Sequence, residues 1–270
     1  MVKVATILNS HANTDLTIST VESIKRWVGP EMFVLIDGAT WKTWGKDAKL
    51  GCPKLEGAYH NSPISPHRNL TIGLYTAMNT WPDADWFCMT EYDCYFGNDT
   101  FKEDLEDADK RGVWMAGTDY REENYDMSFL SQMLQTDIIG SKYLLGCCVF
   151  LNAKFVRKLA EINFFNTFLN WTNPFEQGFI PYFKGYSFVE HLFPTLADHY
   201  GGKVEGWAKW NSKLNCWEGN FKRYPMRFHP DLDSTADCFQ EAAIMHPIKD
   251  LGHPFRSMYK RKSNGKQHKI

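Results

Sequence analysis

The chain has 270 residues, of which 43% are hydrophobic, and its formal net charge is -2. A chain of this size and composition can bury a full core as one large domain. The small negative charge gives no general attraction to nucleic acid, so we do not expect a nucleic-acid-binding protein.

Cysteine usage and hydropathy restrict the cellular setting. The seven cysteines are an odd number, are scattered, and form no CxxC pattern. This is typical of buried thiols in a reducing compartment, rather than of a disulfide framework or a zinc site. The chain opens directly on an apolar run without a charged leader, and no apolar run approaches the length of a membrane span. We therefore expect a soluble, cytoplasmic protein.

The first elements along the chain predict a β-α-β unit. Apolar runs predict strands over residues 2–8 and 32–36, and helical spacing of apolar residues predicts a helix over 15–28. Such a unit implies parallel strands and a right-handed crossover. Ligands of such sheets bind beyond the carboxyl ends of the strands. The polar loop at residues 9–13 and Asp37 are therefore candidates for a binding site.

A helix is predicted next, after a loop rich in Trp, Gly and Pro at residues 39–66. It begins near Ser65 and ends near Trp81. Arg68 and Asn69 lie in its first turn, where backbone amides favour anions. Arg68 is therefore either an ordinary surface arginine or an anion contact.

The stretch WFCMTEYDCYF at residues 86–96 predicts a buried strand that runs out into an acidic tip. In extended backbone, Glu91 and Asp93 point to one face and Tyr92 to the other. Two carboxylates so placed repel each other unless they are solvated or share a cation. A hard divalent cation between them and a phosphate would satisfy both.

The second half of the chain alternates helices and strands before an irregular end. Predicted helices cover 99–110, 153–162 and 188–200, predicted strands cover 113–117, 144–151 and 203–210, and 121–143 and 164–188 are less regular. A short strand over 243–249 carries His246. Residues 256–270 hold six Lys or Arg and no acid. This tail is either a solvated terminus or a weak anchor to anionic lipid or polymer.

His246 would complete a mixed oxygen and nitrogen ligand set with Glu91 and Asp93. Such a set suits manganese at least as well as magnesium. Considered separately, Glu91 and Asp93 are typical of a solvated loop pair, and His246 is typical of a core or rim histidine. Together, in an α/β frame with polar loops after its first strands, they favour a cation site.

The predicted β-α-β unit, the acidic tip and the late histidine follow one another along the chain as in a GT-A fold glycosyltransferase. The chain resembles family-2-like nucleotide-sugar-dependent enzymes most nearly. The resemblance covers roughly residues 2–249, motif by motif. It implies an α/β, Rossmann-like fold of GT-A type, with a mostly parallel central sheet flanked by helices. The domain would span residues 1–250, with a C-terminal elaboration and a basic tail over 251–270. The family's Asp-x-Asp motif stands here as Glu91-Tyr92-Asp93.

The resemblance implies a Mn²⁺ or Mg²⁺ ion and a nucleoside-diphosphate sugar of UDP or GDP type. Asp93 would be the direct metal ligand, His246 the third metal element, and Glu91 a contact to the ribose or to the metal through water. The remaining donor contacts would be Asn9, Ser10, His11, Asp37, Arg68, Asn69 and Lys249.

The implied reaction is hexosyl or related transfer to a hydroxyl acceptor, such as a glycan or a lipid- or protein-linked saccharide. Glu190 stands where inverting members carry their catalytic base, although the usual Glu-Asp pair is here Glu190-His191. Asp119 is the second candidate, because it also ends a strand on this rim; its ordinary role would be to cap a turn. Retaining transfer stays open.

Two rival classes remain. A nucleotidyltransferase of sugar phosphates would carry a Gly-rich, basic loop after the first strand, where this chain has NSHANTD. A non-catalytic nucleotide- or carbohydrate-binding protein would explain the departures at Glu91 and His191. The expected partners are a donor and a saccharide acceptor, with no nucleic acid and at most peripheral membrane contact through the basic tail.

Overall fold

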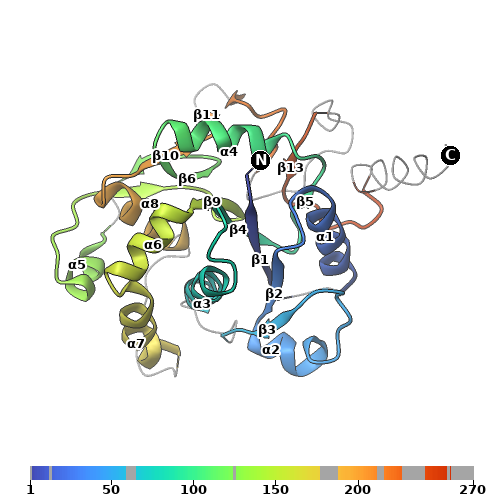
Figure 1. Ribbon diagram of the computed structural model, residues 1–270, viewed down its shortest axis with the longest axis horizontal. Coiled ribbons are helices and arrows are strands. Elements are labelled where there is room, and N and C mark those ends of the chain that lie inside the picture. The colour runs from blue at the N-terminus through green and yellow to red at the C-terminus, as the bar shows by residue number, and fades with distance from the viewer. Residues whose placement is uncertain are drawn as a thin grey trace.

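The central feature of the computed structural model is a seven-stranded sheet with helices on both faces (Figure 1). The structure describes residues 2–11, 14–58, 65–123, 126–176, 188–211, 216–226, 241–253 and 256. In spatial order the strands are β10 (Lys203–Gly206), β6 (Val113–Gly117), β9 (Cys148–Asn152), β4 (Trp86–Glu91), β1 (Val4–Ser10), β2 (Met32–Ile36) and β3 (Lys54–Glu56).

The strands are parallel except β9, which runs antiparallel to both of its neighbours, β4 and β6. The carboxyl ends of β1, β2, β4 and β6 therefore meet at one edge, and the amino end of β9 joins them there. Side chains at this edge come from loops that are distant in sequence.

Helices on the two faces bury both sides of the sheet. The helices on one face are α1 (Thr14–Trp27) and α4 (Phe101–Lys110), and those on the other are α3 (Ser65–Thr80), α6 (Ala153–Glu161), α7 (Phe164–Glu176) and α8 (Phe188–His199). Ile7 and Met89 face the α3 side, while Leu8 and Cys88 face the α1 side. Burial on both faces explains the nearly continuous apolar runs of β1 and β4.

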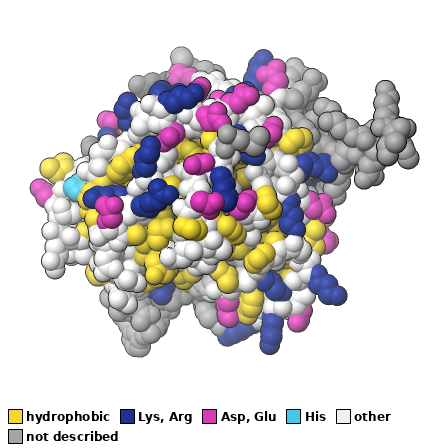
Figure 2. All heavy atoms as spheres, in the orientation of Figure 1, with side chains coloured by type: hydrophobic (Ala, Val, Ile, Leu, Met, Phe, Trp, Pro, Cys, Tyr) yellow, Lys and Arg dark blue, Asp and Glu magenta, His cyan; other side chains and the backbone are white. Residues whose placement is uncertain are grey.

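Short elements decorate this frame. They are α2 (Gly38–Thr40), η1 (Trp41–Gly45), β5 (Tyr95–Phe96), β7 (Arg121–Glu123), α5 (Ser128–Leu134), β8 (Ser141–Tyr143), β11 (Ala208–Asn211), β12 (Cys216–Gly219) and β13 (Ile244–Met245). On the face drawn in Figure 2, basic and acidic side chains are interspersed rather than separated, in keeping with the small net charge. Every helix among the described residues is too short or too polar to cross a bilayer.

The predicted fold class, α/β with a mostly parallel central sheet flanked by helices, is confirmed. The strand predicted over 144–151 begins only at Cys148, because Leu144 N donates to Glu190 O and Leu145 N donates to Thr118 O instead of joining the ladder. The strand predicted over 203–210 is two strands, β10 and β11, which belong to different sheets. The first part of the less regular stretch over 164–188 forms α7, and its Phe164, Phe165 and Phe168 are buried at helical spacing. Residues 177–187 of that stretch lie outside the described residues.

The predicted loop over 39–66 also needs correction. Its described part contains α2, η1 and β3. The assignment of Arg256 to a solvated tail is wrong as well, because that side chain is fully buried. The domain boundary at residue 250 itself stays a prediction.

Candidate functional site

The acidic tip closes into a turn rather than continuing as extended backbone. Glu91 ends β4, and Cys94 N donates to Glu91 O at 3.1 Å across Tyr92 and Asp93. The Thr20 hydroxyl on α1 lies within hydrogen-bonding distance of the carbonyl oxygens of Tyr92 (2.6 Å) and Cys94 (2.9 Å). Strand alternation therefore does not set the direction of the two acids. Their shared approach to one histidine shows that they converge.

That histidine is His246. Its Nε2 atom lies 3.3 Å from Asp93 Oδ1 and 3.5 Å from Glu91 Oε2. The antiparallel pairing of β13 with β5 brings His246 to the tip, and Ile248 N donates to Asp93 O at 2.9 Å. The side chains of Asp93 and His246 are each 4% exposed, whereas that of Glu91 is 44% exposed. The site thus has a buried floor and one solvent-facing carboxylate.

The donor set fits a divalent cation. Apart from the approach of His246, Asp93 Oδ1 is buried without a hydrogen-bond partner among the described residues, and leaving such an oxygen unsatisfied is costly. One ligand atom each from Glu91, Asp93 and His246 lie within 4.8 Å of one another. Adjacent ligands about 2.1 Å from an octahedral cation are about 3 Å apart. Small adjustments would therefore let these three atoms share one ion.

Electrostatics keep Asp93 ready to bind a cation. Burial by itself raises the pKa of Asp93, but His246 and Lys249 offset that effect, and the pKa lies below its usual value. Lys249 Nζ is 3.9 Å from Asp93 Oδ2, and its side chain is 43% exposed. Lys249 therefore places a solvent-accessible positive charge beside the acids.

Glu190 lies in the first turn of α8, within electrostatic range of Glu91. Burial raises its pKa and the charge of Glu91 raises it further, while the Gly146 backbone N–H and the nearby His191 offset part of the rise. Gly146 N donates to Glu190 Oε1 at 3.4 Å, so a loop beside β9 orients the carboxyl. A partly buried carboxyl with a raised pKa is suited to proton transfer.

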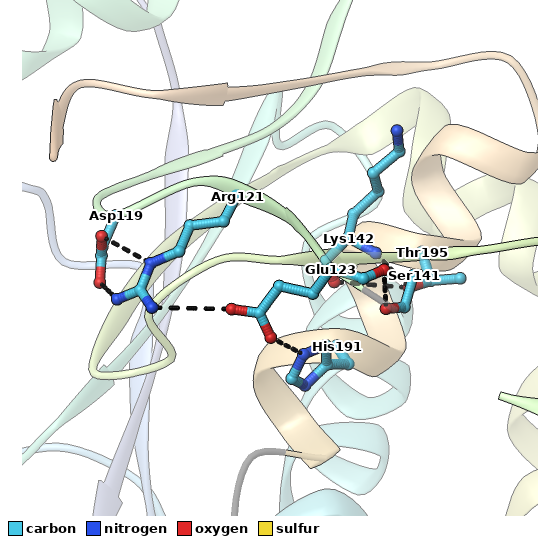
Figure 3. Close-up of polar contacts among 7 residues, drawn as sticks. All are labelled: Asp119, Arg121, Glu123, Ser141, Lys142, His191 and Thr195. Carbon is cyan, nitrogen blue, oxygen red and sulfur yellow. Dashed lines mark hydrogen bonds and ion pairs between the residues drawn. The ribbon is translucent and has the colours of Figure 1, made fainter. Parts of the chain in front are cut away.

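A chain of ion pairs runs from Asp119 to His191, the residue that follows Glu190 (Figure 3). Both carboxylate oxygens of Asp119 accept hydrogen bonds from Arg121. Arg121 Nη1 lies 3.6 Å from Glu123 Oε1, and Glu123 Oε2 lies 3.0 Å from His191 Nε2. Arg121 thus engages both oxygens of Asp119, which makes Asp119 less available than an unpaired carboxylate to take a proton from an acceptor hydroxyl. His191, which stands where the family that the chain resembles has its second acid, is hydrogen-bonded to Glu123.

The loop after β1 lies against the acidic tip. Asn9 pairs in register with Glu91, and Asn9 Oδ1 is buried without a hydrogen-bond partner among the described residues. The His11 ring packs edge-on against Tyr92, with centroids 4.8 Å apart. Ser10 Oγ is 2.8 Å from Thr17 Oγ1 and is buried. The structure thus brings Asn9 and His11 against the acidic tip, while Ser10 bonds to α1.

Three other predicted donor contacts are held by the protein itself. The Asp37 carboxylate caps α2 by accepting hydrogen bonds from the backbone N–H groups of Ala39 and Thr40 and from the Thr40 hydroxyl. Asn69 Oδ1 accepts from Ala58 N at 2.6 Å. Arg68 Nη1 donates to two oxygens of α7 at 2.7 Å each. A nucleotide would have to compete with these bonds, so the three contacts stay predictions.

Sequence reasoning missed two features of the site. Arg256 Nη2 donates to Ile248 O at 2.8 Å and Nη1 donates to Ser19 Oγ at 2.9 Å, which ties the segment after His246 to α1. Cys94 and Cys147 lie beside His246. Arg256 was not identified because it belongs to a basic segment that is typical of a solvated terminus. Cys147 was not identified because an apolar run does not indicate the direction of its strand, and it is the direction of β9 that brings Cys147 to this edge.

Comparisons with known proteins leave the family open. No family model and no curated protein matches the chain. Among solved structures, an active-site mutant of LgtC is 14% identical over 97% of this chain and 95% of its own, with a TM-score of 0.45. A cytidylyltransferase from Leptospira borgpetersenii serovar Hardjo-bovis is 13% identical over 66% and 74%, with a TM-score of 0.36. The 4-diphosphocytidyl-2C-methyl-D-erythritolsynthase from Anaerococcus prevotii is 8% identical over 76% and 88%, with a TM-score of 0.40. These likenesses are distant, and the printed functions of these proteins are not shown for this chain.

Proposed function

We propose that the protein is a metal-dependent glycosyltransferase that moves a sugar from a nucleoside-diphosphate sugar of UDP or GDP type to a hydroxyl acceptor. The observation that carries this proposal is the convergence of Glu91, Asp93 and His246 at the carboxyl edge of a mostly parallel sheet. Ligands bind at this edge in sheets of this kind. Two carboxylates and one imidazole form a set that suits Mn²⁺, with Mg²⁺ as the alternative.

Each group of the site has a part in this reaction. Asp93, Glu91 and His246 would hold the cation, which when bound supplies positive charge for the departing diphosphate. The exposed ammonium of Lys249, which lies beside Asp93, is placed to contact a phosphate oxygen. The Oδ1 atom of Asn9, which has no hydrogen-bond partner in the described part of the chain, offers an acceptor to a hydroxyl or amide of the donor.

Glu190 is the base that the geometry favours. Its raised pKa lies closer to neutral pH than that of an ordinary glutamate, and a base matched to the working pH transfers protons best. Glu190 would take the proton of the acceptor hydroxyl as that oxygen attacks the anomeric carbon. Direct displacement of this kind inverts the configuration at that carbon. The pairing of Asp119 with Arg121 leaves Asp119 the weaker candidate.

The test is turnover of a panel of UDP- and GDP-sugars with and without Mn²⁺. We expect Mn²⁺-dependent release of nucleoside diphosphate from one class of donor, and its loss in Asp93→Asn. The exposed Asp99, a short way along the chain, provides a matched control as Asp99→Asn. If no donor is cleaved but UDP or GDP binds with Mn²⁺, the chain is a binding protein. If pyrophosphate is released from CTP or UTP and a sugar phosphate, it is a nucleotidyltransferase.

A further inference from the structure

A buried cluster of sulfur and nitrogen atoms lies beside the acidic tip. The Sγ atoms of Cys94 and Cys147 and a ring nitrogen of His246 lie within 4.8 Å of one another, and all three residues are buried. Cys94 follows the turn that holds Asp93. Cys147 immediately precedes β9, whose antiparallel direction brings its amino end to the carboxyl end of β4.

Backbone contacts hold the two cysteine segments together. Cys94 Sγ donates to Cys147 O at 3.2 Å, and Glu91 N donates to the same oxygen at 3.0 Å. The two thiols and the imidazole therefore come from three separate segments that strand pairing holds in place. Preformed ligands of this kind lower the cost of ordering a metal site.

We propose that Cys94, Cys147 and His246 form a second metal site that takes Zn²⁺, and that Zn²⁺ bound there withdraws His246 from Glu91 and Asp93. A set of two thiolates and one imidazole binds Zn²⁺ in preference to hard cations such as Mg²⁺. Tetrahedral zinc, with Zn–S about 2.3 Å and Zn–N about 2.0 Å, separates its ligand atoms by about 3.5–4 Å. A spacing within 4.8 Å reaches this value with small movements.

The two sites compete because they share one ring. A neutral imidazole has one nitrogen with a free lone pair, and the other nitrogen carries the proton. His246 can therefore serve one cation at a time, whichever nitrogen is used. Each cysteine thiol gives its proton to solvent as its S–Zn bond forms, and no electron is transferred. The competition rests on the proposed function, whereas the sulfur site does not.

Cobalt tests the sulfur site in the full chain. Co²⁺ replaces Zn²⁺ and absorbs strongly in the near ultraviolet when thiolates bind it. We expect one Co²⁺ per chain with this band, bleached by added Zn²⁺ and largely lost in Cys94→Ala and in Cys147→Ala. Cys88→Ala is the matched control, because Cys88 is equally buried and lies outside the cluster. A band that survives in both variants, or bound Co²⁺ without a band, would overturn the assignment.

A second measurement needs no variant. Zn²⁺ should protect Cys94 and Cys147, but not Cys88, from alkylation in partly denatured wild-type protein, as read by peptide mass spectrometry. Equal alkylation of all three cysteines would contradict the proposal even if the alanine variants fail to fold.

Electron paramagnetic resonance of Mn²⁺ separates the two proposals. We expect one added Zn²⁺ to release one bound Mn²⁺ from the wild-type protein and to lose this effect in Cys94→Ala. If Mn²⁺ stays bound while the thiolates hold Zn²⁺, the shared-histidine step is wrong. If Mn²⁺ never binds while the cobalt band forms, the glycosyltransferase site fails and the sulfur site stands.

Discussion

The Nε2 atom of His246 lies 3.3 Å from Oδ1 of Asp93, although the two residues belong to opposite halves of the chain. The pairing of β13 with β5 makes this contact, because β5 begins two residues after Asp93 and β13 ends immediately before His246. The proposed cation site is therefore assembled only in the folded protein, and substitutions that disturb this pairing should affect metal binding.

Asp93→Asn should abolish metal-dependent nucleotide binding. The amide cannot supply the negative charge that Asp93 offers, and Lys249 loses its partner. Turnover should fall as well, because the loss of one group that stabilises charge in the transition state costs about 100-fold or more in rate. Isothermal titration of UDP and GDP in the presence of Mn²⁺ measures the binding. Unchanged affinity in Asp93→Asn, next to an unchanged Asp99→Asn control, would remove Asp93 from the site.

Glu190→Gln should lose activity and gain stability. As the catalytic base, Glu190 is expected to contribute about 10²–10⁴-fold to the rate. The gain in stability arises because burial raises the pKa of Glu190, so the folded chain binds its proton more tightly than the unfolded chain. In the wild type, the protonated Glu190 side chain therefore contributes to stability below about pH 4.3, the ordinary pKa of glutamate. That stabilisation is lost as the pH rises through the raised pKa of the folded state.

Thermal melts at two pH values test this sign. Glu190→Gln should melt several degrees above wild type at pH 8, with a smaller difference at pH 5. Turnover by the wild type should rise with pH, and the apparent pKa of this acid limb should lie above the ordinary pKa of glutamate. Full activity in Glu190→Gln would exclude Glu190 as the base and would favour a retaining mechanism.

His191→Asp should not raise activity above that of the wild type, although it recreates the acidic pair of the family that the chain resembles. The new carboxylate would stand buried near Glu123, whose Oε2 lies 3.0 Å from the present imidazole. A buried, unpaired charge of this kind costs about 3–5 kcal/mol, which a urea titration would detect. His191→Gln is the matched control, because its amide can still donate to Glu123. A stable and more active His191→Asp variant would contradict the role given to the ion-pair chain.

Much of the frame could be predicted from the sequence, because β2 and β6 are short apolar runs, α1 has apolar residues at helical spacing, and all three have clear end signals. Glu91, Asp93 and His246 could be nominated as metal ligands from their residue types. Their proximity could not be predicted, because it depends on the non-local pairing of two-residue strands. The direction of β9 was hidden because an apolar run reads alike in parallel and antiparallel sheets. The capping role of Asp37 was hidden because acids after strands serve caps and ligands equally.

Arg256→Ala should weaken the cation site from a distance. Its guanidinium is buried, lies 4.9 Å over the Tyr95 ring and donates to Ile248 O, so it supports the segment that holds His246. We expect a loss of about 2–4 kcal/mol in the free energy of unfolding and several-fold weaker Mn²⁺ binding. Arg256→Lys keeps the charge and should lose less. Wild-type stability in Arg256→Ala would show that the buried contacts contribute little.

The central claim is that Glu91, Asp93 and His246 hold a cation that binds a nucleoside diphosphate. Its most direct test is calorimetric titration of UDP and GDP into the protein with Mn²⁺ and then with a chelator. We predict binding of one nucleotide per chain with Mn²⁺, its loss with the chelator, and its loss in His246→Ala. Equal binding with and without Mn²⁺, or no binding of either nucleotide, would contradict the claim.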